Sequence, residues 1–353
     1  MSSAPLTFEL HHTIDSLADE WDQLVDRTNA SVFLRPGWFA AWFRAFGRGR
    51  LELIAARRER HLAGLAALER RGAVLRSLTN WHTPLWAPLA EDDEALRALS
   101  RAMVRHARPW LSLGFVDVGT TELEACREAA SSCRMRVYTL ERSPYVVLQG
   151  TWEDFQARLG AKRRGNLRRL WRRLGEQGRV EFEVRYGRAD LAQLLEEGFR
   201  AEASGWKGER GTAIGSAPHT RRFYEEVAAW ASARGALRLG FLRLDGRALA
   251  FDFAVEEGGA HSLLKTGFDA AWHSFAPGLL LRERMIEHCF GQGLETYEFL
   301  GDATGWKLEW DDATHERVAL EAFRRTPAGA VGWATWAYAR PAANLLLSAL
   351  RRN

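Results

Sequence analysis

Two acidic residues inside apolar segments are the first candidates for chemistry in this 353-residue chain. Asp252 lies within the apolar run 248–255, and Glu298 lies within the run 296–300, directly after Tyr297. Alternation along a strand places each carboxylate on the face opposite its aromatic neighbours. A carboxylate in a cleft can accept a proton from a reacting group, and a tyrosine can donate one. We therefore expect Asp252 and Glu298 as candidate general bases and Tyr297 as a candidate general acid.

Each carboxylate also has a structural explanation. A charge inside an apolar strand needs solvent or a partner. Lys265 or Arg282 could form an ion pair with Asp252, and Glu298 could likewise serve the fold alone. The three cysteines lack the spacing of a metal site. We therefore expect a site without a metal. No Ser-His-Asp or Cys-His arrangement in the sequence competes with the two carboxylates.

A Pro-Gly pair at residues 277 and 278 predicts the start of a helix over 279–290. Proline at the first helical position fixes φ and lacks the N–H that would be left without a helical partner there. The remaining free N–H groups of a helix start point outward and bind phosphate groups well. This helix start is therefore a candidate anion site.

Positive charge is concentrated in one segment, although the formal net charge of the chain is only +4. Leu167, Leu170, Trp171 and Leu174 share one face, so the segment is expected to be an amphipathic helix with a basic outer face. Such a face is either a solvated surface or an anion site for the phosphates of a coenzyme or an RNA. Its basic residues, with no acidic residue among them, are Arg158, Lys162, Arg163, Arg164, Arg168, Arg169, Arg172 and Arg173.

The order of strands and helices is predicted to repeat roughly in the two halves of the chain. Each half reads as a strand, a helical segment, a meander of strands, a helix, a strand and a final strand. In the second half, Asp245-Gly246 is the turn signal of a two-residue hairpin within this meander. This alternation predicts an α/β (α+β) fold. The expected divisions are an N-terminal domain over 1–148, a C-terminal domain over 149–325 and a helical tail over 326–353.

The tail is rich in alanine and tryptophan, and residues 327–350 include a single charge, Arg340. That length could span a bilayer, but Arg340-Pro341 near the middle argues against a span. Packing on the rest of the chain or on a second subunit is the main expectation, and a peripheral membrane contact is the alternative. The N-terminal residues lack the pattern of a signal peptide, so a cytoplasmic protein is expected.

Several segments of the second half together resemble a known motif series. They are Asn166 in the basic helix, Trp206-Lys207-Gly208, Asp245-Gly246, Lys265 with Phe268-Asp269, residues 275–281, Phe299-Leu-Gly-Asp302 and Trp306-Lys307. The series resembles the CelD/BcsL-type GNAT acyltransferases, also described as BioF2-like acetyltransferase domains. The resemblance covers about 155–310, and the first half fits by layout only. That family is similar to the FemAB-type transferases, which carry two GNAT-like folds in one chain. The resemblance implies tandem GNAT-like domains, each a twisted, mostly antiparallel mixed sheet flanked by helices.

The resemblance implies transfer of an acyl group from acetyl-CoA or another acyl-CoA to an amine or hydroxyl acceptor. The acceptor would be a small molecule, a glycan or a peptide, in polysaccharide or cell-envelope metabolism. The residues expected at the coenzyme are Phe275, Ala276, Pro277, Gly278, Leu279, Leu280 and Arg282. Those expected at the substrate are Trp206, Lys207, Lys265, Asp269 and Lys307. Ala276 stands where the related family more often has serine, so one hydroxyl donor to phosphate is missing.

Two other functions stay open at this point. A FemAB-like transferase would use aminoacyl-tRNA, and the basic helix would then hold RNA. The absence of an inserted helical coiled-coil arm weighs against it. A non-catalytic scaffold or binding protein of an exopolysaccharide system would use the same cleft to bind a glycan or a partner. The protein is expected to be a monomer or a homodimer.

Overall fold

The computed structural model describes residues 4–204 and 214–339, and these residues form two compact units. Within the described residues, the first unit holds the chain up to Phe43, Gly47–Glu141 and the part from Glu316 onward. The second unit holds Arg44–Phe46 and Arg142–His315. The last strand therefore lies with the first unit, whereas the sequence-based division grouped it with the second half.

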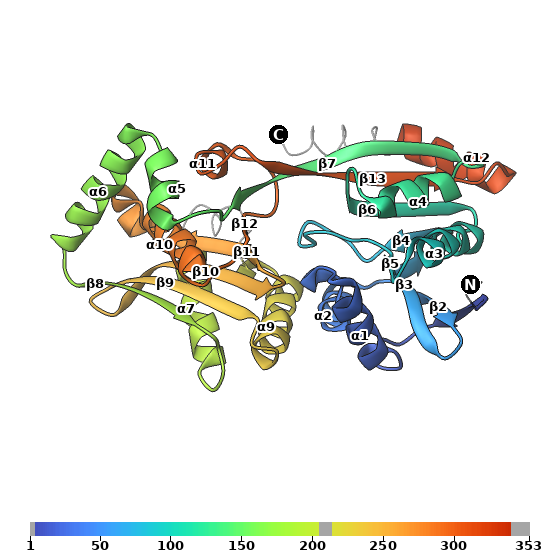
Figure 1. Cartoon of the computed structure of the whole chain (residues 1–353), viewed down its shortest axis with the longest axis horizontal. Helices are drawn as coiled ribbons and strands as arrows, with labels where there is room; N and C mark the ends of the chain where they lie inside the picture. The colour runs from blue at the N-terminus through green and yellow to red at the C-terminus, as the bar shows by residue number, and fades with distance from the viewer. Residues whose placement is uncertain (1–3, 205–213, 340–353) are drawn as a thin grey trace. The chain divides into compact units, whose positions relative to one another are not determined.

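The first unit is a mixed sheet with helices packed on it (Figure 1). Helices α1 and α3 pack on β3, and α4 packs against α3. Its elements are β1 (Leu6–His11), α1 (Ala18–Thr28), α2 (Pro36–Phe46), β2 (Arg50–Arg58), β3 (His61–Arg71), β4 (Val74–Ser77), β5 (Leu89–Ala90), α3 (Asp93–His106), β6 (Trp110–Asp117), α4 (Thr121–Ala129), β7 (Arg134–Val147, of which the residues from Arg142 on belong to the second unit), β13 (Thr314–Phe323) and α12 (Pro327–Ala334).

The second unit is also a mixed sheet with helices packed on it (Figure 1). Helix α7 packs on β10 and β11, while α10 packs on β9, β10 and β11 and contacts α5 and α6. Its elements are α5 (Trp152–Arg158), α6 (Ala161–Gly175), β8 (Val180–Arg185), α7 (Leu191–Ala203), α9 (Pro218–Ala233), β9 (Leu237–Leu244), β10 (Arg247–Glu257), β11 (Ala260–Phe268), the short helix η3 (Ala270–Phe275), α10 (Pro277–Gly291), β12 (Thr296–Glu298) and α11 (Gly305–Leu308).

The strands of the two units pair in the same order. In the first unit β1-β2-β3-β4 pair antiparallel, β4 pairs parallel with β6, and β6 pairs antiparallel with β13. In the second unit β8-β9-β10-β11 pair antiparallel, β11 pairs parallel with β12, and β12 pairs antiparallel with the end of β7. In each unit a helix, α3 or α10, lies in the chain before the parallel strand, as a parallel connection requires. The expected tandem fold of mostly antiparallel mixed sheets is confirmed.

Alternation along β10 separates its side chains between two helical layers. Phe251 packs on Phe199 of α7 and Phe253 packs on Tyr224 of α9. Asp252, between them in the chain, points to the opposite face and reaches Arg282 of α10. The hairpin turn at Asp245 and Gly246 has positive φ at both residues, as the Asp-Gly signal predicts.

No helix within residues 4–204 and 214–339 is long and apolar enough to cross a bilayer. The part of the tail from residue 340 lies outside the described residues.

Close packing of α7 on β10 depends on one glycine. A Cβ atom at Gly198 would lie 2.5 Å from Cδ2 and Cζ of the Phe251 ring. We expect Gly198→Ala to lower the free energy of unfolding by about 1–3 kcal/mol because it overpacks this contact. Gly165→Ala on α6 is the matched control, since nothing lies within 4 Å of an added Cβ there. That control should raise stability by up to about 1 kcal/mol through helix propensity. Urea unfolding followed by tryptophan fluorescence measures both, and equal effects of the two substitutions would contradict the packing argument.

Candidate functional site

A cavity of about 460 Å³ lies in the second unit at the start of α10. The end of α7, the end of β11, the short helix η3, the start of α10 and the short helix α11 supply its walls. Most of its lining is apolar, and Glu202 and Arg282 contribute the carboxylate and the guanidinium. Its lining residues are Glu202, Thr266, Gly267, Phe268, His273, Ala276, Gly278, Leu279, Arg282 and Trp306.

The start of α10 has the features of an anion site. Pro277 occupies the first turn, no side chain caps the helix, and the first turn contains no acidic residue. Ala276 precedes it in the left-handed region, with φ 49° and ψ 51°. Its carbonyl accepts from the N–H of Leu279 at 3.0 Å. Of the seven residues expected at a coenzyme, the cavity lining includes Ala276, Gly278, Leu279 and Arg282.

Arg282 is the centre of a buried polar cluster beside the cavity. Its side chain is 1% exposed and forms a two-pronged ion pair with Asp252, at 2.6 Å and 2.9 Å. It also donates to the hydroxyl oxygen of Thr266 at 3.1 Å and to that of Tyr297. The strand register brings Asp252 and Thr266 to the same guanidinium, because Thr266 lies directly opposite Asp252 in the β10–β11 pair. The cluster holds a guanidinium at the cavity wall in one orientation.

Asp252 and Tyr297 lie behind this wall rather than in it. Both are fully buried, and neither lines the cavity. Both oxygens of Asp252 are engaged by Arg282, which is the ion pair expected as the alternative to a general base. Burial raises the pKa of Tyr297 well above its ordinary value, so its hydroxyl remains protonated. Asp252 and Tyr297 can therefore influence a bound molecule only through Arg282, because they hold the Arg282 guanidinium in place.

Glu298 lies apart from this cluster. Its carboxylate is paired with the imidazole of His315 at 3.3 Å, and His315 stacks on Tyr145 with ring centroids 4.2 Å apart. In the parallel pair of β11 and β12, Glu298 lies opposite Ser262. No residue of this group lines the cavity.

The residues expected at a substrate are dispersed. The ammonium of Lys265 lies 5.4 Å from the ring centroid of Tyr224. Asp269 accepts from the N–H of Ala271 at 3.0 Å and pairs with Arg247, so it caps η3.

Lys307 donates to the carbonyl of Asp302 at 2.9 Å and to that of Leu300, and it thereby closes the turn after β12. Trp206 and Lys207 lie outside the described residues.

Glu202 is the carboxylate of the cavity lining, and the sequence analysis did not select it. It is 1% exposed and lies at the end of α7. A sequence signal existed, because Leu194, Gly198 and Glu202 are spaced by four and share one helix face. An acidic residue on such a buried face needs an explanation. Trp306 also lines the cavity and was expected only as part of the Trp306-Lys307 motif, whereas His273, another lining residue, was not selected.

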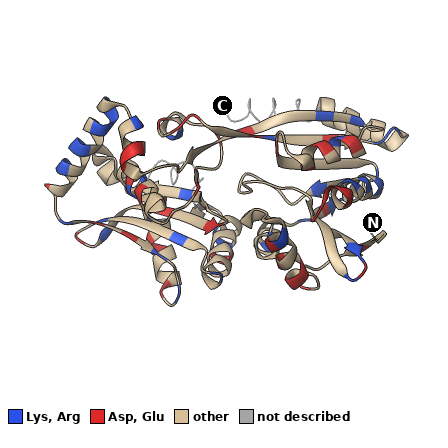
Figure 2. Ribbon diagram, viewed as in Figure 1, with Lys and Arg blue, Asp and Glu red and all other residues tan. Residues whose placement is uncertain are grey.

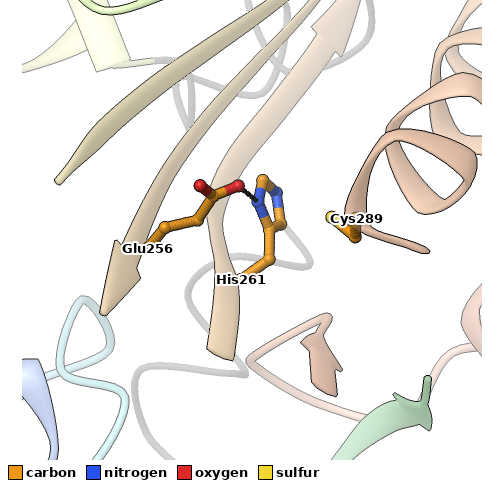
Figure 3. Close-up of side chains that lie close together, drawn as sticks. All are labelled: Glu256, His261 and Cys289. Atoms are coloured by element: carbon orange, nitrogen blue, oxygen red, sulfur yellow. Dashed lines mark hydrogen bonds and ion pairs between the residues drawn. The ribbon is translucent and has the colours of Figure 1, made fainter. Parts of the chain in front are cut away.

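A second buried cluster joins Glu256, His261 and Cys289, whose candidate ligand atoms all lie within 4.8 Å of one another (Figure 3). Glu256 holds Nδ1 of His261 at 2.7 Å and also pairs with Arg238. Burial raises the pKa of the Cys289 thiol well above its ordinary value, so the sulfur is not a thiolate. The His261 ring stacks on Tyr297 at 4.7 Å. Sequence spacing did not indicate this cluster, since strand pairing and helix packing bring its members together.

Basic residues follow one another along helix α6 (Figure 2), and some of them have partners within the second unit. Arg163 pairs with Glu309 and lies over the Trp310 ring, with 4.2 Å from its Cζ to the centroid. Arg164 donates to carbonyls at the end of α5, and Arg173 lies over Phe275. The exposed basic residues of α6 are Lys162, Arg168, Arg169 and Arg172.

The fold and the cavity together define a class of domain. Residues 161–308 match the model of a family described as the acetyltransferase (GNAT) domain. That range runs from α6 to α11 and includes every residue that lines the cavity. A GNAT acetyltransferase domain is therefore present in the second unit, and it supports a transferase. No match is found among curated protein sequences.

Solved structures extend the likeness over most of the chain. FemX superposes with a TM-score of 0.60 at 13% identity, covering 90% of this chain and 98% of FemX. The C-terminal domain of a candidate lysylphosphatidylglycerol synthetase from Agrobacterium fabrum gives 0.59 at 14% identity, covering 90% and 95%. L-PGS from Bacillus licheniformis gives 0.56 at 12% identity, covering 87% and 92%. At these identities the likeness concerns the fold. It agrees with the fold expected from the resemblance to FemAB-like proteins, and the CelD/BcsL grouping stays a prediction.

The ion pair between Arg282 and Asp252 predicts a large loss of stability when the charge of Asp252 is removed. We expect Asp252→Asn to lower the free energy of unfolding by about 3–5 kcal/mol because it leaves a guanidinium buried without its counter-ion. Thr266→Val removes only one hydrogen bond of the same guanidinium and should cost about 1 kcal/mol. Urea unfolding of the two variants and the wild type tests this. An Asp252→Asn variant no less stable than Thr266→Val would show that the ion pair does not hold α10 in place.

Proposed function

We propose that the second unit binds an acyl-CoA at the start of α10 and transfers the acyl group to an acceptor in the adjoining cavity. The observation that carries the proposal is an uncapped helix N-terminus, free of acidic residues, that forms part of the cavity wall. The N–H of Gly278 in the first turn and the positive end of the helix dipole favour the pyrophosphate of the coenzyme. Pro277 has no N–H, and the N–H groups of Leu279 and Leu280 donate to the carbonyl of Ala276. The match of residues 161–308 to the GNAT domain family supports the same placement.

The first unit has a corresponding helix, α3, which precedes its parallel strand. In contrast to α10, helix α3 begins with acidic residues. Helix α3 is capped by Asp92, which accepts from the N–H of Ala95 at 2.8 Å. Asp93 and Glu94 follow in its first turn, and Arg58 pairs with Asp92. Carboxylates at that position occupy the place of a phosphate and repel one. The proposal therefore places the coenzyme in the second unit alone.

The reaction needs proximity and charge stabilisation more than covalent help from the protein. The acceptor nitrogen or oxygen attacks the thioester carbonyl carbon, and the carbonyl oxygen becomes an oxyanion. The C–S bond then breaks, the acyl group stays on the acceptor, the acceptor loses one proton, and the CoA thiolate takes up one proton. The cavity holds both reactants together, and Arg282 offers a fixed positive charge at its wall. In this proposal Asp252 and Tyr297 are positioning residues for Arg282, and Glu298 takes no part.

The exposed basic face of α6 favours a second function. A FemAB-like transferase would present such a face to the phosphates of aminoacyl-tRNA. Lys162, Arg168, Arg169 and Arg172 are exposed on one short helix, and this supports RNA binding as the alternative. A non-catalytic scaffold that binds a glycan or a partner is the third candidate.

Substitution of Leu279 tests the coenzyme site. Leu279 lies in the first turn of α10 and lines the cavity. We expect Leu279→Glu to raise the Kd for CoA about tenfold or more, since a carboxylate at a helix N-terminus opposes an anion by roughly 1–2 kcal/mol. Leu279→Gln is the matched control, because glutamine has nearly the same shape as glutamate but no charge. This variant should bind CoA as the wild type does. Isothermal titration calorimetry with CoA measures both.

Ligand binding to the wild-type protein distinguishes the three candidate functions. Thermal-shift measurements with acetyl-CoA and with tRNA are run in parallel. Stabilisation by acetyl-CoA supports the acyl-CoA transferase. Stabilisation by tRNA alone, weakened by added salt, transfers the assignment to the tRNA-dependent enzyme. No response to either ligand would favour the scaffold.

A further inference from the structure

We propose that helix α12 and the short helix η4 (Thr335–Ala339), which follows it directly, dock on the surface of a membrane that contains anionic lipids. The observation that carries the proposal is an exposed helix face without charges, bordered by arginines. Both helices belong to the first unit. The inference therefore concerns a surface distinct from the cavity of the second unit, and it does not depend on which ligand that cavity binds.

The exposed side of α12 and η4 is uncharged. Val331 is 67% exposed and Tyr338 is 74% exposed. Ala334 is also exposed, and its spacing from the other two residues places all three on one helix face. The other exposed residues of 327–338 are Pro327, Ala328, Ala330 and Thr335, and none carries a charge. A helix face in water is ordinarily charged or polar, so this face suits a less polar surrounding.

The opposite side of the two helices packs on the first unit (Figure 1). The rings of Trp333 and Trp336 lie against Phe323 at the end of β13, with centroids 5.5 Å and 6.3 Å away. Trp336 also contacts Tyr138 of β7, with centroids 5.9 Å apart. These contacts hold the helices to the sheet by one face. The apolar exposed face is therefore presented outward in a fixed orientation.

Two exposed arginines of β7 border the tryptophans of these helices. Cζ of Arg134 lies 3.7 Å from the ring centroid of Trp333, and Cζ of Arg136 lies 5.4 Å from that of Trp336. Such long side chains cover apolar surface with their stems and keep the charged end in water or among lipid headgroups. Aromatic and basic residues beside an apolar helix face are typical of helices that lie in a membrane–water interface.

The charge of this part of the chain has one sign. Residues 322–353 include five arginines and no acidic residue, and two of the arginines, Arg324 and Arg325, directly precede α12. The acidic residue before this segment, Glu321, is 2% exposed and accepts from Nε1 of Trp110 at 2.6 Å, so its charge is held inside the unit. Positive charge beside an apolar face favours an anionic bilayer. A second copy of the same surface would bring like charges together instead.

Co-sedimentation of the full chain with vesicles tests the proposal. One set of vesicles is phosphatidylcholine alone, and the other contains equal parts of phosphatidylcholine and phosphatidylserine. We expect the wild type to bind the mixed vesicles about tenfold or more tightly than the neutral ones, since each arginine near an anionic surface contributes roughly fivefold in affinity. Added salt should weaken this binding because it screens the charges.

Substitution of Val331 tests the apolar face. Val331→Asp should lower the affinity for the mixed vesicles about tenfold or more, because it places a carboxylate where the bilayer is apolar and its surface is negative. Val118→Asp is the matched control. Val118 is 47% exposed in the same unit, and its N–H donates to the carbonyl of Glu316, at the end of β13 away from α12. This control should bind as the wild type does.

A pair of arginine substitutions tests the charge separately. Arg324→Gln combined with Arg325→Gln should weaken binding to the mixed vesicles about tenfold or more. Arg101→Gln combined with Arg105→Gln is the matched control, because it removes the same charge from two exposed positions on α3. The second pair should have little effect on the affinity.

Three results would overturn the inference. The first is equal binding of the wild type to both kinds of vesicle. The second is an equal loss of affinity in each variant and its matched control. The third comes from light scattering without vesicles: a dimer that Val331→Asp dissociates would show that the exposed face binds a second copy of the chain.

Discussion

The ion pair between Arg282 and Asp252 is the interaction on which the second unit depends. A guanidinium with 1% exposure is tolerated only if its charge and its hydrogen bonds are matched. Asp252 on β10 supplies the charge, while Thr266 on β11 and Tyr297 on β12 accept further hydrogen bonds. One side chain thus joins α10 to three strands. Because Arg282 lies in the second turn of α10, the same contacts hold the start of this helix in the cavity wall.

Buried polar groups in this unit serve two different purposes. Glu256 and His261 pair with each other, and His261 stacks on Tyr297 beside the Arg282 cluster. These groups pair with one another and tie strands together behind the cavity. Glu202 differs from them because it lies in the cavity wall, where its charge can act on a bound molecule. The position of a carboxylate relative to the cavity, rather than its burial alone, decides whether a bound molecule can reach it.

The two units show how one fold can carry unequal chemistry. Their strand pairings follow the same order, yet α3 begins with three successive acidic residues and α10 begins with alanine, proline and glycine. The helix dipole is the same in both, so the side chains of the first turn decide whether an anion is attracted. Each unit also completes its sheet with a distant segment: β13 pairs with β6, and the end of β7 pairs with β12. The folding of each unit therefore depends on chain that belongs, by sequence order, to the other half.

The sequence alone determined the local elements and the helix start. Alternation predicted the strands of β9 to β11, the Asp-Gly pair predicted their turn, and Pro277 with Gly278 predicted the start of α10, because these signals act over a few residues. It also limited the partner of Asp252 to two residues, one of which is Arg282. Only the tertiary structure decided which of the two pairs with it, placed β13 in the first unit, and brought Glu202 to the cavity. These outcomes depend on contacts between residues far apart in the chain. The register of β10 against β11 and the packing of α7 and α10 on that sheet set them, and no short-range pattern encodes either.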